Sequence, residues 1–191
     1  MRPSGRLLLV ALAALALRFA HADEVTETYR DRAFDGPVSS ILVVGVTPDT
    51  NVRRMFENSM LRALREAGVT GDSSLARMGS TETLTADAVA AAAQRAEADS
   101  VLVTRVLDVE TENPDTGTTF VEYFTAYAAN DPLPVVTTHT VRVRSDLYVL
   151  AGQRRVWGVE STAVDKQNLF GVIDGIASAV TAQLRKDRLV R

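Results

Sequence analysis

The sequence predicts an α+β fold with a mixed sheet, on three observations. An apolar run at residues 41–46 is typical of a central strand that is buried on both faces. Two helical patterns precede the next apolar run, which permits parallel crossovers. Residues 137–164 then alternate apolar and polar side chains as antiparallel strands do, and an amphipathic helix closes the chain. The predicted architecture is a mixed β-sheet with two N-terminal crossover helices and one C-terminal helix packed on one face.

The first 22 residues have the features of a secretory signal peptide. Two arginines precede an apolar run at residues 7–17, and alanines stand at −3 and −1 relative to Asp23. A helix of that length spans about 16 Å, whereas a bilayer core is roughly 30 Å thick. A retained anchor and a core helix are the alternatives. We expect a periplasmic protein, cleaved between Ala22 and Asp23, with no stable membrane anchor.

Composition narrows the class of protein further. The 191-residue chain has no cysteine, 21 basic and 24 acidic residues, and a net charge of −3, which becomes −6 once the three arginines of the leader are removed. An acidic protein gains nothing from the counterion release that favours nucleic-acid binding, so we expect no nucleic-acid partner. Without cysteine there are no disulfides and no lipidated N-terminal residue. We expect a flexible arm at 23–37 and one α+β domain at 38–191.

The first predicted helix follows the apolar strand directly. Thr50 or Asn51 is expected to cap a helix over residues 52–67, and Gly68 to end it. Apolar residues recur there at three- and four-residue spacing on a single stripe, which is the pattern of a helix lying on a core.

A short strand is expected at 74–78, followed by a second helix. Thr85 is the expected cap of that alanine-rich helix over residues 86–98, whose small side chains allow close packing on a sheet. Residues 100–110 begin as a buried strand and become alternating and acidic.

The second half of the chain predicts a meander. The turn-forming residues 113–117 separate the preceding strand from one at 119–128. The clearest alternation in the chain covers 137–150, and 154–164 returns antiparallel to it. Asn168 then opens the final helix, beneath which Trp157 is expected to pack.

Five segments, in their order along the chain, resemble those of a known group of proteins. They are 41–46, Asn51–Glu57, Ala98–Val103, Arg155–Ser161 and Leu184–Asp187. The similarity is to the poorly characterised bacterial envelope lipoproteins related in fold to the N-terminal domain of TolB, to CsgG and to LpoB, and it covers most of residues 38–190. It implies a periplasmic adaptor, assembly factor or partner-binding domain without a catalytic constellation. The lipoproteins' lipid-bearing cysteine is missing here, so the resemblance does not extend to outer-membrane anchorage.

The residue inventory argues against familiar catalytic chemistry. His139 is the one histidine left after cleavage, and cysteine is absent, so zinc sites and Cys–His pairs are excluded or nearly so. A Ser–His–Asp triad would need His139, yet no GxSxG motif accompanies it. We interpret His139 as an ordinary strand-edge residue. We expect no enzyme activity, no cofactor and no resident metal.

Three acidic residues leave two further chemistries open. Asp108, Glu110 and Glu112 recur at a spacing of two, so one strand would project all three from the same face. Such a face is compatible with calcium or, paired across a cleft, with a carboxylate-based hydrolase. We interpret it instead as the solvated face of a strand.

The candidate partner-binding residues lie in an aromatic segment. Phe120 and Phe124 fall on one face of the predicted strand, and Tyr123 and Tyr127 on the other. Tyrosine is enriched in interface cores. The alternative is a strand covered by the proline-containing loop at 129–134.

The sequence therefore predicts a soluble, non-enzymatic periplasmic accessory protein that binds another envelope component. The partner would be an envelope protein or a peptidoglycan-associated one. It would contact the aromatic segment or the open sheet face, where Arg142 and Arg144 are expected to face Asp146 and Glu160. A periplasmic protein that binds a small molecule or ion is the alternative, and a hydrolase is a third.

Overall fold

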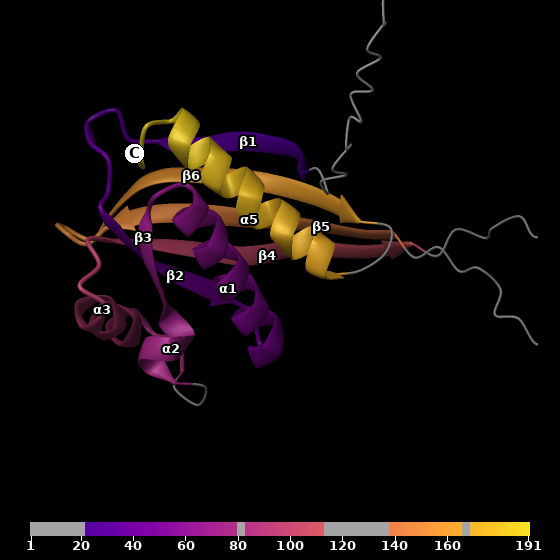
Figure 1. The fold of residues 1–191 in the computed structure, drawn as a ribbon, viewed down its shortest axis with the longest axis horizontal. Helices are drawn as coiled ribbons and strands as arrows, with labels where there is room; N and C mark the ends of the chain where they lie inside the picture. The colour runs from indigo at the N-terminus through magenta and orange to yellow at the C-terminus, as the bar shows by residue number, and fades with distance from the viewer. Residues whose placement is uncertain (1–21, 80–82, 113–137, 166–168) are drawn as a thin grey trace, which may run out of the picture.

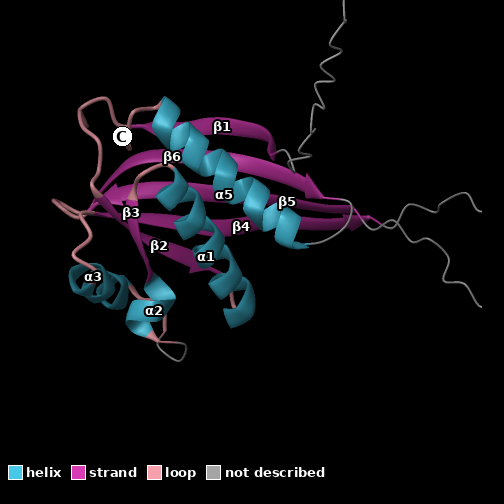
Figure 2. Ribbon diagram, in the orientation of Figure 1, coloured by secondary structure: helices cyan, strands magenta, loops and turns pink. Residues whose placement is uncertain are grey.

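The computed structural model describes residues 22–79, 83–112, 138–165 and 169–191, and these form an α+β fold (Figure 1). One six-stranded mixed sheet has the order β1-β6-β5-β4-β2-β3, and helices α1 and α5 lie side by side on one of its faces (Figure 2). The predicted class is confirmed. The strands are β1 (Ala22–Arg30), β2 (Ser40–Val46), β3 (Thr70–Ser73), β4 (Ser100–Glu112), β5 (Thr138–Val149) and β6 (Arg154–Asp165). The described helices are α1 (Thr50–Glu66), α2 (Ser74–Met78), α3 (Ala86–Arg95) and α5 (Leu169–Lys186).

The parallel part of the sheet places helices on both faces. β2 pairs in parallel with β3 on one side and with β4 on the other. The chain therefore moves across the sheet in one direction from β2 to β3, and in the opposite direction from β3 past β2 to β4. Right-handed crossovers of opposite direction require opposite faces. Ile41 and Val43 accordingly join the core under α1 and α5, whereas Leu42 and Val44 pack with α3. The predicted packing on one face of the sheet therefore holds for α1 and α5, whereas α3 covers part of the opposite face.

The remaining strands pair antiparallel, but the predicted order is wrong in one place: β4 pairs with β5, where a hairpin with residues 119–128 was expected. β4, β5, β6 and β1 pair antiparallel in that order. On β5, Val141, Val143 and Leu147 are buried in the main core, while Arg142 and Arg144 lie on the opposite face. We call that opposite face, over β5 and β6, the open face because no described helix covers it.

The flexible arm expected at 23–37 is wrong for its first part. Residues Ala22–Arg30 form edge strand β1, which pairs antiparallel with β6. Val25 packs against the core, while Glu27 and its neighbours are exposed. β1 buries few side chains and its pairing with β6 has register irregularities, so its sequence shows no clear two-residue period. The strand was therefore not predicted.

The helix α1 (Thr50–Glu66) begins one residue earlier than a cap at Thr50, the earlier of the two predicted caps, would allow. Asp49 is the N-cap, and its carboxylate accepts hydrogen bonds from the backbone N–H groups of Asn51 (2.8 Å) and Val52 (3.2 Å). Thr50 and Asn51 are therefore not the cap. Gly68 follows the helix with φ of +77°, as predicted for its end.

The strand expected at 74–78 is wrong. Those residues form the short helix α2, and β3 precedes it at Thr70–Ser73. Ser73 caps α2 by accepting from the Ala76 N–H at 3.2 Å. Thr85 caps α3 as predicted, with Ala88 N–H as its donor at 3.2 Å.

The prediction for Trp157 is confirmed, whereas several predicted segments lie outside the described residues. Trp157 is fully buried beneath α5 as expected, and its indole N–H donates to Asp187 at 2.7 Å. The predicted turn at 113–117 and strand at 119–128 lie outside the described residues, as does nearly all of the proposed leader.

Candidate binding groove at the carboxyl end of β2

An apolar groove of about 360 Å³ lies between α1, α5 and the sheet. Its walls come from the N-terminal halves of both helices, and its floor from β4 and β5. In open sheets with crossover helices, ligands commonly bind beyond the carboxyl end of a strand at which the chain order reverses, and β2 is that strand here. The lining residues are Gly45, Val46, Thr47, Pro48, Val52, Phe56, Thr104, Val106, Val109, Val141, Val143, Leu169, Val172, Ile173 and Ile176.

A bulge in β4 supplies half of the floor. The register with β5 shifts between Val106 and Asp108, so Leu107 is the extra residue. Val106 and Val109 both line the groove as a result. Had the two-residue period continued from Leu102, Asp108 would have pointed into the groove; the bulge turns it to the open face instead.

The rim of the groove exposes large apolar side chains. Val46 is 42% exposed, Val106 43% and Val109 54%. Phe170, next to the lining residue Leu169 at the start of α5, is 62% exposed. Only one further large apolar residue in the described part of the chain, Tyr29, reaches such exposure. Apolar exposure concentrated at one hollow marks an interaction surface rather than scattered surface residues.

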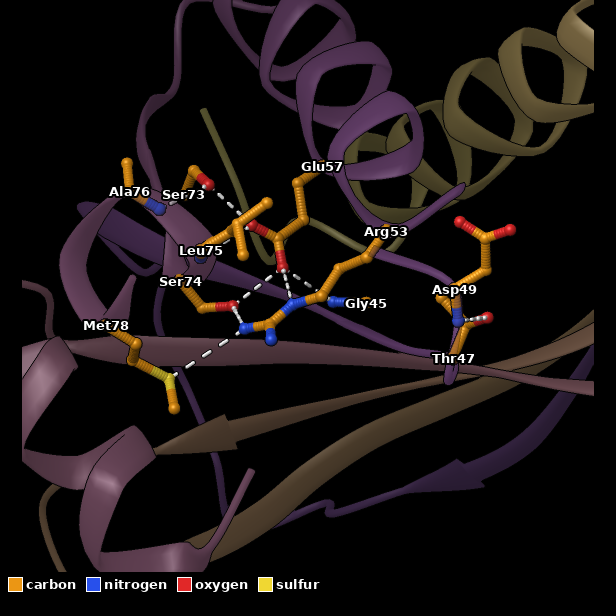
Figure 3. Close-up of polar contacts among 10 residues, drawn as sticks. All are labelled: Gly45, Thr47, Asp49, Arg53, Glu57, Ser73, Ser74, Leu75, Ala76 and Met78. Carbon is orange, nitrogen blue, oxygen red and sulfur yellow. Dashed lines mark hydrogen bonds and ion pairs between the residues drawn. The ribbon is translucent and has the colours of Figure 1, made fainter. Parts of the chain in front are cut away.

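A buried polar network holds the α1 wall in place, as Figure 3 shows. Glu57 is 0% exposed and Arg53 6%, and Arg53 Nε donates to Glu57 Oε1 at 3.0 Å. Glu57 Oε1 also accepts from the Gly45 N–H at 3.1 Å and from Ser74 Oγ at 2.7 Å. Its Oε2 accepts from Ser73 Oγ and, at 2.9 Å, from a backbone N–H of α2.

One carboxylate thus ties α1 to β2 and to the start of α2. The second nitrogen of the guanidinium is bonded as well, since Arg53 Nη2 donates to Ser74 Oγ at 2.7 Å. Because both Glu57 oxygens are saturated with donors from the protein itself, this network is a structural lock and not a vacant site.

The lock and the groove meet at Gly45. Its N–H bonds Glu57, and the residue itself lines the groove. A Cβ at this position would lie 3.2 Å from Phe56 Cδ1, so the absence of a side chain lets α1 approach β2 closely. Phe56 then forms the inner wall of the groove.

The α5 wall is anchored at its far end. Asp187 accepts from the Trp157 indole at 2.7 Å and from Gln183 Nε2 at 3.1 Å. Arg30 Nη2 on β1 donates to the Asp187 carbonyl at 3.0 Å. An ion pair joins α1 directly to α5, in which Arg62 Nη2 donates to Asp174 Oδ1 at 2.6 Å.

The groove floor contains one polar pair. Thr104 Oγ1 and Ser145 Oγ lie 2.8 Å apart and are buried, so each hydroxyl already has a partner. The other lining side chains, apart from Thr47 at the rim, are apolar. This part of the surface suits an apolar occupant.

The acidic residues predicted to share a face are placed on the open face. Asp108 and Glu110 are exposed, and Asp108 lies 3.8 Å from Arg142; the side chain of Glu112 is outside the described residues. Arg144 pairs with Asp146 at 3.1 Å and approaches Glu160 at 4.0 Å, as predicted. Among the described residues, no three acidic, histidine or cysteine side chains gather in a way that would hold a metal ion.

His139 lies on β5, opposite Thr111 of β4 and Asp165 of β6. The aromatic candidates Phe120, Tyr123, Phe124 and Tyr127 are outside the described residues, so their role stays a prediction. Sequence reasoning missed the groove. The signal for it was the pair of valines on either side of Leu107, whose three-residue spacing interrupts the strand period.

Comparison with known proteins shows the fold. No protein-family model matches the chain, and no curated protein matches it. Two crystal forms of the PelC dodecamer from Paraburkholderia phytofirmans are similar, each with a TM-score of 0.51, at 15% and 16% identity. They cover 88% of this chain and 99% and 98% of theirs. Lipoprotein GNA1162 from Neisseria meningitidis has a TM-score of 0.44 at 20% identity, covering 78% of this chain and 99% of that one. Across the segments that the structure describes, no helix has the length and apolarity needed to span a bilayer.

Proposed function

We propose that this chain is a non-enzymatic accessory protein of the bacterial cell envelope, and that its groove binds a second copy of the chain. The observation that carries the proposal is the concentration of exposed apolar side chains at the groove rim. Fully burying a valine or phenylalanine contributes roughly 1.5–3 kcal/mol, and half-exposed ones contribute a share of that. Association therefore gains free energy when a second copy covers the exposed apolar side chains at the rim, which are Val46, Val106, Val109 and Phe170.

The second copy is favoured by the fold comparison. PelC, which shares the fold over nearly its whole length, is described as a dodecamer. Exposed Phe170 beside an apolar hollow is also self-complementary, because a phenylalanine of one copy can enter the groove of another. Copies joined in this way could form a closed pair or a ring. The same residues lie at the contact in either arrangement.

The envelope location rests on the leader and on the resemblance to the TolB, CsgG and LpoB group. An envelope protein or a peptidoglycan-associated partner would then meet the assembled protein on another surface. The open face, where Arg142, Arg144 and Arg155 alternate with Asp108 and Asp146, suits such a contact. A non-enzymatic role fits the apolar groove, whose hydroxyl pair is internally bonded.

The proposal predicts that Val109→Asp weakens self-association by about 30-fold or more, because a carboxylate buried in an apolar contact lacks a partner. Sedimentation velocity of the purified protein over a dilution series measures this. Gln94→Asp, on an exposed position of α3, is the matched control and should associate like the wild type. Circular dichroism confirms that both variants fold. A wild-type protein that stays monomeric at high concentration, or a variant that associates normally, would contradict the proposal.

A further inference from the structure

A second hollow, of about 440 Å³, lies on the other face of the sheet between α3 and the β5–β6 turn. Its size falls within the roughly 300–1,000 Å³ of small-molecule sites. Unlike the groove, it combines an apolar floor with several polar groups. We call it the α3 pocket. Its lining residues are Val44, Val46, Leu84, Thr85, Ala86, Asp87, Val89, Ala90, Val101, Val103, Tyr148, Val149, Leu150 and Gln153.

The floor of the α3 pocket is a row of valines from β2 and β4. Val44, Val101 and Val103 belong to the smaller apolar cluster, which α3 covers in part with small alanine side chains. The close packing on the sheet that the small side chains of α3 were expected to allow does not extend over these valines, and the space that remains is the α3 pocket. The body of a ligand here is therefore apolar.

Four polar side chains line the pocket, and one of them, Thr85, is already bonded as the cap of α3. Tyr148, half-buried on β5, and Gln153 in the following turn line one side. Asp87, in the first turn of α3, lines the other. Of the described residues that line the pocket, Asp87 alone is charged. Asp87 therefore gives one side of the pocket a negative charge, and the Tyr148 ring lines the other side.

The turn that carries Gln153 is held in an uncommon conformation. Gln153 has φ of +48°, a left-handed geometry that costs energy for a residue with a side chain. Its N–H is bonded to the Leu150 carbonyl at 3.1 Å, so the turn is closed by its own backbone. The positive φ belongs to the tight hairpin turn between β5 and β6, which places Gln153 at the pocket's edge.

We propose that the α3 pocket binds a small amphipathic cation, an amine or quaternary ammonium attached to an apolar body. The valine floor takes the apolar body, and Asp87 takes the cationic group. The pocket and the groove lie on opposite faces and share only Val46 among their lining residues. Ligand binding is therefore separable from self-association.

Three six-carbon probes of matched size test the ligand class: hexyltrimethylammonium, hexanol and hexanoate. Titration followed by amide chemical shifts should show saturable changes at Thr85–Ala90 and Tyr148–Gln153. The cation should bind on the order of tenfold more tightly than hexanoate, with hexanol between them. Shifts confined to groove residues such as Val109, no saturable shifts, or equal affinity for the three probes would overturn the proposal.

Two variants locate the site. Asp87→Asn should abolish the preference for the cation while leaving hexanol binding unchanged, and Asp35→Asn, on an exposed loop, should keep the preference. Ala90→Leu fills the pocket with a good helix former and should weaken all three probes about tenfold or more. Full binding by Ala90→Leu would place the probes elsewhere and refute the assignment. Self-association should be the same in every variant.

Discussion

Replacing Glu57 with alanine will lower the free energy of unfolding by about 3–5 kcal/mol. The change removes the acceptor for Arg53, whose guanidinium is 6% exposed and would be left buried without its counterion. It also deprives the Gly45 N–H of its partner, and an unsatisfied buried donor adds its own desolvation cost. Domains of this size have unfolding free energies of about 5–15 kcal/mol, so the loss is a large share.

Urea denaturation followed by circular dichroism measures the loss. Asp174→Ala is the matched control, because Asp174 also pairs with an arginine of α1 but is 49% exposed. It should cost about 1 kcal/mol or less, as exposed ion pairs do. If the two alanine variants unfold at the same denaturant concentration, the buried network does not hold α1 as described.

Replacing both members of the pair distinguishes the ion pair from the wider network. Arg53→Met combined with Glu57→Leu removes both charges and keeps the apolar volume. We expect the double variant to be more stable than Glu57→Ala but less stable than the wild type. The shortfall arises because the N–H groups of Gly45 and Leu75 still lack an acceptor.

The second large effect is expected at the other wall. Trp157→Ala will destabilise the protein by about 3–5 kcal/mol, the range for deleting a large buried aromatic side chain. Trp157 is fully buried beneath α5 and is bonded to Asp187, so its loss leaves a cavity and removes one of the hydrogen bonds to that carboxylate. Thermal unfolding followed by circular dichroism gives the change.

Trp157→Phe separates the two contributions. It keeps most of the packing and loses the indole N–H, so its cost should be about 1–2 kcal/mol. Since Trp157 is the only tryptophan of the chain, intrinsic fluorescence of the wild type reports the same unfolding event. An alanine variant as stable as the phenylalanine variant would show that the packing of α5 does not depend on this side chain.

Much of the fold could be predicted because its local signals agree with its packing. The apolar run at 41–46 serves two cores, one on each face of β2, and the alternation of β5 follows directly from its buried valines. The helix limits were close because caps and Gly68 act through their nearest neighbours. Short elements failed: α2 is stabilised by Ser73 and by the distant Glu57 rather than by its own sequence pattern.

The candidate site was harder to predict because it depends on contacts between distant segments. A bulge at Leu107 changes which face the following residues occupy, and periodicity assumes that no residue is skipped. β1 was missed because an edge strand needs few apolar residues to pair. Gly45 is unremarkable in the sequence, yet it joins the buried lock to the groove through one N–H and one missing side chain.

The two walls of the groove are fixed before any partner binds. The Arg53–Glu57 network holds α1, and Trp157 with Asp187 holds α5. A preformed apolar surface of this kind loses little conformational entropy on association, which favours tight contact for a modest area.

Engineered cysteines report on whether a second copy binds at the groove, because the protein has no cysteine of its own. Val109→Cys and Phe170→Cys each place one thiol at the groove rim, and Gln94→Cys places one on the exposed side of α3. A short bismaleimide should link copies through Val109→Cys alone in a closed pair, or through mixed Val109→Cys and Phe170→Cys proteins in a ring. It should leave Gln94→Cys monomeric. Linking at Gln94→Cys as efficient as at the groove rim, or none at the rim, would contradict a groove that binds a second copy.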